Sequence, residues 1–162
     1  MSKQDNDVGE IAREVLETML EKMDLEATVA LATLPFAEEI DGVVPVGLNV
    51  NGDDLGILIG RRGQTLACLQ YLLRLIVANR TGTWLPIIVD VEGYKVRRYE
   101  ALRALAERIA GQVAARQRPF TLEPMPAYER RIIHLALADY PGVTTESTGM
   151  GEGRKVVIMP RQ

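Results

Sequence analysis

Residues 55–80 read LGILIGRRGQTLACLQYLLRLIVANR, and this stretch decides the predicted fold. A short apolar turn leads into Gly60-Arg61-Arg62-Gly63. An amphipathic helix follows over residues 64–80, and its predicted buried stripe consists of Leu66, Leu69, Leu72, Leu73 and Ile76. Glycine has no Cβ and lets a phosphate approach the main chain, while the N-terminus of a helix favours an anion. The two arginines add charge and fork-shaped donors. The stretch predicts either a clamp for a nucleic-acid backbone or a tight helix–helix turn with solvated arginines.

The segments on either side of this stretch give the order of the elements. Helical spacing of apolar residues predicts a helix over residues 8–23. Alternating and β-branched residues predict strands over 27–33, 43–50 and 83–92, and Pro45 predicts an edge strand or a bulge. Asp53 and Asp54 are candidate caps for the short turn. The order helix–strand–strand–helix–helix–strand therefore fills residues 8–92.

The remainder of the chain predicts a second, smaller set of elements. They are a long helix, a short strand, a helix and two paired strands, over residues 94–117, 118–126, 127–140, 142–148 and 154–160. We expect an α+β protein with two domains, residues 1–92 and residues 93–162.

Composition and charge restrict the class of protein. The 162 residues are 47% hydrophobic and 25% charged, which is typical of a folded soluble domain. The lone Cys68 cannot form an internal disulfide, no stretch approaches the roughly 20 apolar residues that cross a bilayer, and the N-terminus is polar. We expect a cytoplasmic protein without membrane insertion.

Charge is distributed unevenly along the chain. Residues 1–54 hold three Lys/Arg against thirteen Asp/Glu, whereas residues 55–162 hold sixteen against nine. The later part thus carries the positive charge, although the net charge is −3. This asymmetry indicates either a basic binding surface or arginines that only coat long helices.

A second motif is Arg130-Arg131-Ile132-Ile133-His134. Arg130 and His134 are four residues apart, so on a helix they share one face and could bind a phosphate or a base edge. A lone histidine is otherwise a structural residue. Further basic residues could extend this surface, namely Lys95, Arg97, Arg98, Arg154 and Lys155.

The two motifs, taken with their surroundings, resemble a known family. A G-x-x-G loop between helices, after two strands and before a third, resembles the type II KH fold. The stretch LEPMPAYERRIIHLAL, then Thr145-x-Ser147-x-Gly149, then RKVVI, resembles the R-3-H (Arg-x-x-x-His) domain of the bacterial Jag family, the SpoIIIJ-associated proteins. The joining segment DVEGYKVRRYEAL also resembles the linker helix of that family. The resemblance covers about residues 8–160, without the further N-terminal Jag domain of many members.

The resemblance implies binding of single-stranded RNA. Gly60, Arg61, Arg62 and Gly63 would hold phosphates, and Arg130, Arg131 and His134 would add a second contact. A KH groove for the bases would involve Ile57, Ile59, Leu66 and Ile88 or Val89, for each of which core packing is the alternative. The resemblance also implies a small single-KH partner or self-association, and a role in envelope growth or division. Two alternatives stay open: an adaptor whose KH domain mainly dimerises, and binding of single-stranded DNA.

Catalysis finds little support in the residues. One histidine and one cysteine provide neither a Ser-His-Asp triad nor a zinc site, and the glycine loop lacks the Lys-Ser/Thr of a P-loop. The low aromatic content of 5% disfavours a stacking platform of the RRM or OB type. We expect a binding protein with no catalytic residue, no metal and no cofactor.

Overall fold

The structure, a computed structural model, describes residues 3–34 and 42–161. The chain divides into two compact units, one ending at Lys95 and the other beginning at Val96. Each unit has a hydrophobic core of its own.

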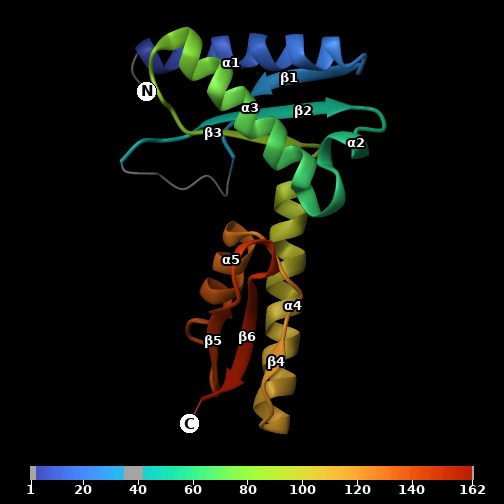
Figure 1. Ribbon diagram of the computed structural model, residues 1–162, viewed down its shortest axis with the longest axis vertical. Helices are drawn as coiled ribbons and strands as arrows, with labels where there is room; N and C mark the ends of the chain where they lie inside the picture. The colour runs from blue at the N-terminus through green and yellow to red at the C-terminus, as the bar shows by residue number, and fades with distance from the viewer. Residues whose placement is uncertain (1–2, 35–41, 162) are drawn as a thin grey trace. The chain divides into compact units, whose positions relative to one another are not determined.

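Unit 1 has the predicted element order, helix–strand–strand–helix–helix–strand (Figure 1). β1 is antiparallel to β2, which is parallel to β3, so that β2 is the central strand of the sheet. A 3-10 turn, Arg61–Gly63, separates the last two helices. The elements are α1 (Lys3–Lys22), β1 (Ala27–Leu31), β2 (Val46–Gly52), α2 (Gly56–Ile59), α3 (Gln64–Thr81) and β3 (Ile87–Val91).

Alternation along the strands builds the core of unit 1. Leu48 and Val50 of β2 lie beside Val89 and Val91 of β3, and all four are fully buried. Strand residues two apart share a face of the sheet, so this face is apolar and is covered by α1 and α3. Burial of such side chains stabilises the fold by about 1.5–3 kcal/mol each.

The buried side of α3 differs from the one that the sequence predicts. Leu66, Leu69, Leu73 and Val77 are buried, as the three- and four-residue spacing requires. Leu72 and Ile76, predicted as part of the buried stripe, are instead exposed together with Cys68, Tyr71 and Leu75. The helix is apolar on both sides, so periodicity alone does not identify the side that faces the sheet.

Two further expectations for unit 1 are wrong in detail. Pro45 lies before β2 rather than within it, and ladder bonding begins with the N–H of Val46, which donates to the carbonyl of Pro86 at 2.9 Å. The residue at the N-cap of α2 is Leu55, and no side chain caps that helix, so neither Asp53 nor Asp54 has the predicted role.

The outer edge of β3 is closed by side chains. The side-chain oxygen of Gln70, Oε1, accepts hydrogen bonds from the Val89 N–H at 2.9 Å and from the Lys95 ammonium at 2.8 Å. Arg74 Nε donates to the Ile87 carbonyl at 2.8 Å. The buried carboxylate of Asp90 accepts the N–H of Lys95 at 3.0 Å. Burial lowers the pKa of Lys95 to about 8, since the attraction of Asp90 opposes this only in part and Arg74 reinforces it.

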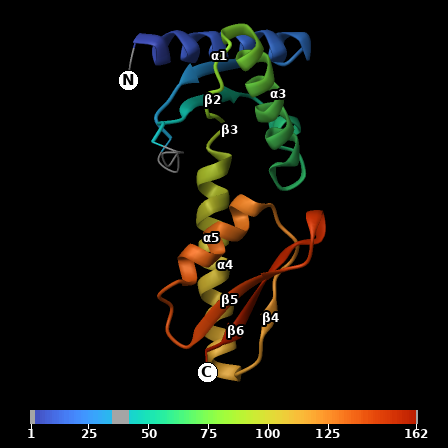
Figure 2. The same cartoon turned by 60° about the vertical axis from the view of Figure 1, so that its left-hand side comes forward.

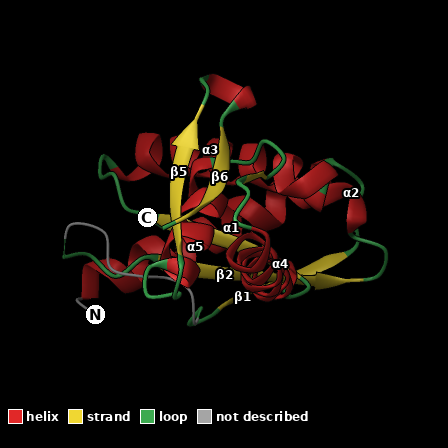
Figure 3. Cartoon of the chain, turned by 90° about the horizontal axis from the view of Figure 1, so that it is seen from below, coloured by secondary structure: helices red, strands yellow, loops and turns green. Residues whose placement is uncertain are grey.

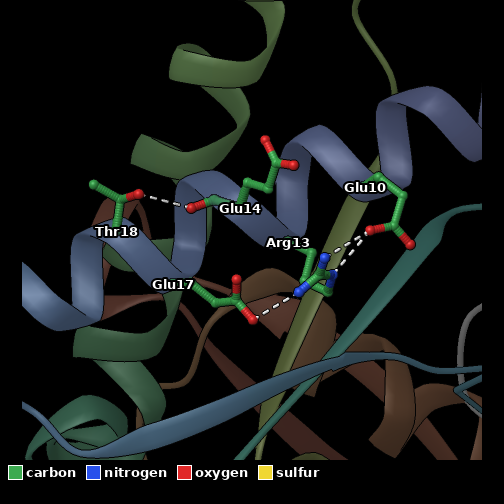
Figure 4. Close-up of polar contacts among 5 residues, drawn as sticks. All are labelled: Glu10, Arg13, Glu14, Glu17 and Thr18. Atoms are coloured by element: carbon green, nitrogen blue, oxygen red, sulfur yellow. Dashed lines mark hydrogen bonds and ion pairs between the residues drawn. The ribbon is translucent and has the colours of Figure 1, made fainter.

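The outer surface of α1 carries the acidic charge of unit 1. Arg13 bonds Glu10 at 2.9 Å and Glu17 at 2.8 Å, one turn to either side, whereas Glu14 is not paired with it (Figure 4). Exposed pairs of this kind contribute little to stability, because water and salt screen the attraction between the charges. The charge asymmetry of the sequence therefore corresponds, in this helix, to an acidic solvent-facing side.

Unit 2 has the predicted order of a long helix, a short strand, a helix and two strands (Figure 2). Its sheet is antiparallel in the order β4-β6-β5, and the β5–β6 hairpin ends in a short 3-10 turn, Gly151–Gly153 (Figure 3). The elements are α4 (Tyr94–Arg116), β4 (Phe120–Thr121), α5 (Ala127–Leu137), β5 (Val143–Thr148) and β6 (Lys155–Pro160).

A buried ion pair joins the two helices of unit 2. The carboxylate of Glu129, at the start of α5, is fully buried and accepts bonds from Arg98 Nε at 2.8 Å and Arg98 Nη2 at 2.9 Å. The hydrophobic core of the same unit is formed by apolar residues of α4, α5 and the sheet, which include Leu102, Ile133 and Ile158. A buried carboxylate requires such a partner, because an uncompensated charge inside a protein is costly.

We predict that Glu129→Gln lowers the free energy of unfolding of unit 2 by about 2 kcal/mol, because the neutral amide offers one oxygen where the carboxylate offers two and so satisfies only part of the Arg98 fork. Urea denaturation measures the effect. The control is Glu107→Gln, which breaks the exposed pair of Glu107 with Arg103 at 3.1 Å and should cost less than about 0.5 kcal/mol. Equal losses in the two variants would contradict the assignment.

A second prediction concerns Lys95. Its pKa is about 8 in the folded protein, below the ordinary value of 10.5, so the folded state releases the proton first as pH rises. The unfolding free energy of the wild type should therefore increase between about pH 8 and pH 10 relative to that of Lys95→Met, which keeps the apolar stem. Denaturation curves at stepped pH test this, and parallel pH profiles for the two proteins would refute it.

Candidate nucleic-acid interface

The Gly60–Gly63 loop has a backbone that depends on glycine. Gly60 ends α2 with φ +68°, and a Cβ at this position would collide with the side chain of Thr65. Gly63 has φ +77° and stands at the N-cap of α3. Both values lie in the left-handed region that L side chains rarely adopt. The loop is therefore a defined turn into a helix N-terminus.

The groups that this loop offers to a ligand are fewer than the sequence suggests. The Gly60 N–H donates to Gly56 at 3.0 Å, the Gly63 N–H lies 3.5 Å from the Gly60 carbonyl, and the Gln64 N–H donates to Arg61. Gly63 is also buried. The N–H groups of both glycines thus lie against carbonyls of α2 and of the loop itself. The side chain of Arg61 is exposed, and Arg62 is half-buried with a left-handed backbone, φ +53°.

The predicted apolar groove divides into accessible and inaccessible residues. Ile57 is 69% exposed and Ile59 is half-buried, both in α2 directly before the loop. Leu66 and Val89 are 1% and 0% exposed, which places them in the core of unit 1 rather than on a groove surface. Ile88, the alternative to Val89, is half-buried. Core packing is therefore the role of Leu66 and Val89, because both face inward between α3 and the sheet.

In unit 2, His134 is engaged on both sides of its ring. Nδ1 lies 2.7 Å from Thr145 Oγ1, and Nε2 lies 2.7 Å from Ser147 Oγ. Desolvation lowers the pKa of His134, and the nearby guanidinium of Arg130 lowers it further, so the ring is neutral at pH 7. The imidazole therefore connects α5 to β5 and keeps no nitrogen for a direct contact with a ligand.

The other predicted basic residues are placed unequally. Arg130 is half-buried and donates to the Met125 carbonyl at 2.7 Å, while Arg131 and Arg154 are exposed. Lys155 pairs with Thr148 across the hairpin, and strand alternation puts both on the face away from Thr145 and Ser147. The structure thus brings Arg130 and His134 together but does not bring Lys155 to them.

Two of the residues proposed to extend the basic surface are used inside the protein. Lys95 bonds Gln70, and Arg98 bonds Glu129. Thr145 and Ser147 entered the sequence analysis only as part of the Thr145-x-Ser147-x-Gly149 motif, which assigned neither of them a role in binding. Their spacing of two residues in a predicted strand was the available signal, since it places both hydroxyls on one face.

Within residues 3–34 and 42–161, no cluster of three or more His, Cys, Asp or Glu side chains could hold a metal ion. None of the helices in these ranges combines the length and the apolar character needed to span a membrane. The side chains at the candidate interface are arginines, the hydroxyls of Thr145 and Ser147, the imidazole of His134 and the exposed Ile57.

Comparison with known proteins assigns both units to families. Residues 10–89 match the family described as KhpA/KhpB, KH domain, and residues 100–160 match the R-3-H domain. A protein of Clostridium symbiosum named RNA-binding protein KhpB is 40% identical over 147 residues, which cover 91% of this chain and 64% of that protein. The protein of the same name from Bacillus subtilis is 36% identical over 151 residues, 86% of this chain and 73% of that protein.

More distant relatives show how much of the longer proteins this chain represents. A protein of Streptococcus pneumoniae, also named RNA-binding protein KhpB, is 29% identical over 155 residues, 94% of this chain but only 45% of its own length. The chain thus spans between about half and three quarters of these three relatives. The two domain matches keep the order and the positions of both motifs, and this chain belongs to the KhpB (Jag) family, with a KH domain followed by an R-3-H domain.

Proposed function

We propose that this chain binds single-stranded RNA, with the sugar-phosphate backbone held at the Gly60–Gly63 loop. The observation that carries the proposal is the exposed guanidinium of Arg61 beside the N-terminus of α3. Positive charge at the positive end of a helix dipole attracts phosphate. The name shared by the relatives, RNA-binding protein KhpB, supports RNA as the ligand.

The apolar surface next to the loop suits the bases. Ile57 is largely exposed and Ile59 half-exposed, and both precede Gly60 directly. Unpaired bases bury apolar faces, which a single strand offers and a duplex does not. A strand whose phosphates meet Arg61 and Arg62 could thus rest its bases on α2.

Unit 2 would add a second contact to the same ligand class. The proposed residues are Arg130, Arg131, His134 and Arg154, with His134 acting through the hydroxyls that it holds. Lys155, on the other face of the hairpin, would have to contact the strand separately. We propose that the two domains comprise residues 1–92 and 93–162. We also propose that the protein acts by binding rather than by catalysis, and that it is located in the cytoplasm. The family resemblance extends the proposal to post-transcriptional regulation linked to envelope growth or division.

We predict that the double variant Arg61→Asp, Arg62→Asp lowers affinity for single-stranded RNA at least tenfold, because two cations become two anions beside the phosphates. Aspartate tolerates the left-handed backbone of position 62, so the fold should be retained. The slope of log affinity against log salt should also become shallower by about 1.4 for two lost phosphate contacts. Fluorescence anisotropy over a salt series measures both effects.

The matched control for this test is Arg108→Asp, Arg116→Asp. Both arginines are exposed on α4, and the change in net charge is the same. If the two double variants lose affinity equally, only the overall charge matters, and the loop is not the binding site. Unchanged binding by a folded Arg61→Asp, Arg62→Asp protein would equally contradict the proposal.

A second candidate function is self-association, or pairing with a small single-KH protein, through α3. The outward side of this helix exposes a run of apolar residues: Tyr71 is 58%, Leu72 50%, Leu75 41% and Ile76 37% exposed. Single exposed apolar residues are normal, but a contiguous apolar helix face is typical of a protein interface. An adaptor role would use this face.

We predict that Leu72→Arg, Leu75→Arg shifts any self-associated protein to the monomer, because two buried charges at an interface would be unpaired. Light scattering after size exclusion, with nuclease treatment, measures the mass. The control is Leu135→Arg on α5, where the leucine is 57% exposed outside the α3 face. A wild type that is monomeric at all concentrations would exclude self-association, and retained RNA binding by the monomeric variant would separate the two functions.

A further inference from the structure

His134 holds two hydroxyl groups in fixed positions. Thr145 and Ser147 lie two residues apart on the face of β5 that turns toward α5, and each hydroxyl oxygen is 2.7 Å from one ring nitrogen. All three residues are half-buried, so each retains some accessible surface. In the described part of the chain, neither hydroxyl has another hydrogen-bond partner.

His134, Thr145 and Ser147 form a hydrogen-bonded triad. The number of protons that its ring nitrogens and hydroxyls carry determines which hydrogen bonds it can make with a ligand. A neutral imidazole carries one N–H donor and one acceptor nitrogen. One hydroxyl must therefore donate its only proton to the ring, and it can then only accept a bond from a ligand. The other hydroxyl accepts from the ring N–H and keeps its own proton for a ligand. In the other tautomer of the imidazole, the two hydroxyls exchange these roles. In either tautomer, one hydroxyl can donate a hydrogen bond to a ligand and the other can only accept one.

The neutral state of the ring follows from its surroundings. From α5, the guanidinium of Arg130 faces His134 and disfavours a second positive charge, and from β5 only the two uncharged hydroxyls contact it. Glu146 lies between these hydroxyls in sequence but on the opposite face of the strand. Burial acts in the same direction by lowering the pKa of the imidazole.

A ligand that satisfies the triad must supply both a donor and an acceptor. Phosphodiester oxygens and the deoxyribose ring oxygen only accept hydrogen bonds. The 2′-hydroxyl of ribose both donates and accepts, and it is the group by which a protein distinguishes RNA from DNA. Arg130, next to the triad, would provide positive charge toward the phosphate that follows such a ribose.

We propose that the hydroxyls of Thr145 and Ser147, positioned by His134, bind a ribose 2′-hydroxyl and so select RNA over DNA. The inference rests on the proposed function, since it names the feature by which unit 2 recognises the same strand. His134 is a positioning residue here, and the ligand contacts are made by the two hydroxyls. Without them, Arg130 alone would bind the backbones of RNA and DNA alike.

The test compares three strands of one sequence: RNA, 2′-O-methyl RNA, and DNA with deoxyuridine in place of uridine. The last two remove the 2′ donor, and all three keep the same base amines. We expect the full chain to bind RNA about three- to tenfold more tightly than either of the others, as the loss of one hydrogen bond and its unpaired partner predicts. Equal binding of RNA and DNA, or of RNA and 2′-O-methyl RNA, would overturn the proposal.

Variants assign the preference to the triad. Thr145→Val, Ser147→Ala should reduce the ratio of RNA to DNA affinity to near one, while Thr144→Val, the same change on the exposed face of β5, should leave the ratio unaltered. A ratio that persists in the folded double variant belongs to another site and overturns the assignment. Absence of binding to all three strands would instead remove the proposed function itself.

The pH dependence of the wild type provides a measurement without any substitution. His134 is the only histidine of the chain, and its protonation makes both ring nitrogens donors. Both hydroxyls then keep their protons for the ligand, which suits phosphate oxygens rather than a 2′-hydroxyl. Because burial and Arg130 lower the pKa of His134, the RNA-to-DNA ratio should stay constant around pH 7 and fall only as the pH is lowered below the ordinary histidine range near 6.5. A ratio that is constant down to about pH 5 contradicts the proposal, even if the double variant does not fold.

Discussion

The buried carboxylate of Glu129 is the constraint on which the geometry of unit 2 depends. It has no access to water, so it must be matched by the Arg98 fork from α4 at 2.8 and 2.9 Å. Helix α5 can therefore pack only in the register that brings these groups together, because any slip leaves a charge buried alone. The same register sets His134 against β5, and thus the positions of the two hydroxyls. The buried pair of Glu129 and Arg98 thus helps to fix where the half-buried hydroxyls of Thr145 and Ser147 lie.

Much of this architecture follows from the sequence alone. The apolar spacing in α1, the alternation in β2 and the β-branched run in β3 gave the order of the elements in unit 1, and the prolines and glycines after residue 117 gave that of unit 2. Local periodicity is sufficient for this, because each element must bury one side. The G-x-x-G spacing also located the turn into α3, which needs glycine at Gly60 and Gly63 for steric reasons.

What the sequence could not provide is the pairing of polar groups distant along the chain. Lys95 and Arg98 read as surface charges, yet one bonds Gln70 and the other Glu129, 25 and 31 residues away. His134 read as half of an exposed pair with Arg130, although its partners are 11 and 13 residues further on. The error for Leu72 and Ile76 has another origin: α3 is apolar on two sides, and only the tertiary fold decides which one faces the sheet.

The two units differ in the physical basis of recognition that they offer. Charge near the N-terminus of α3 acts on any polyanion, since phosphate contacts give affinity that depends on salt and carries no information about the sugar. The hydroxyls on β5 are uncharged. Because both are bonded to one neutral imidazole, one of them can donate a hydrogen bond to a ligand and the other can only accept one. Charge is screened within about 10 Å, whereas hydrogen-bond complementarity acts only at contact. In the proposed mode of binding, the KH domain would hold a strand by charge, and the R-3-H domain would distinguish ribose from deoxyribose by hydrogen bonding.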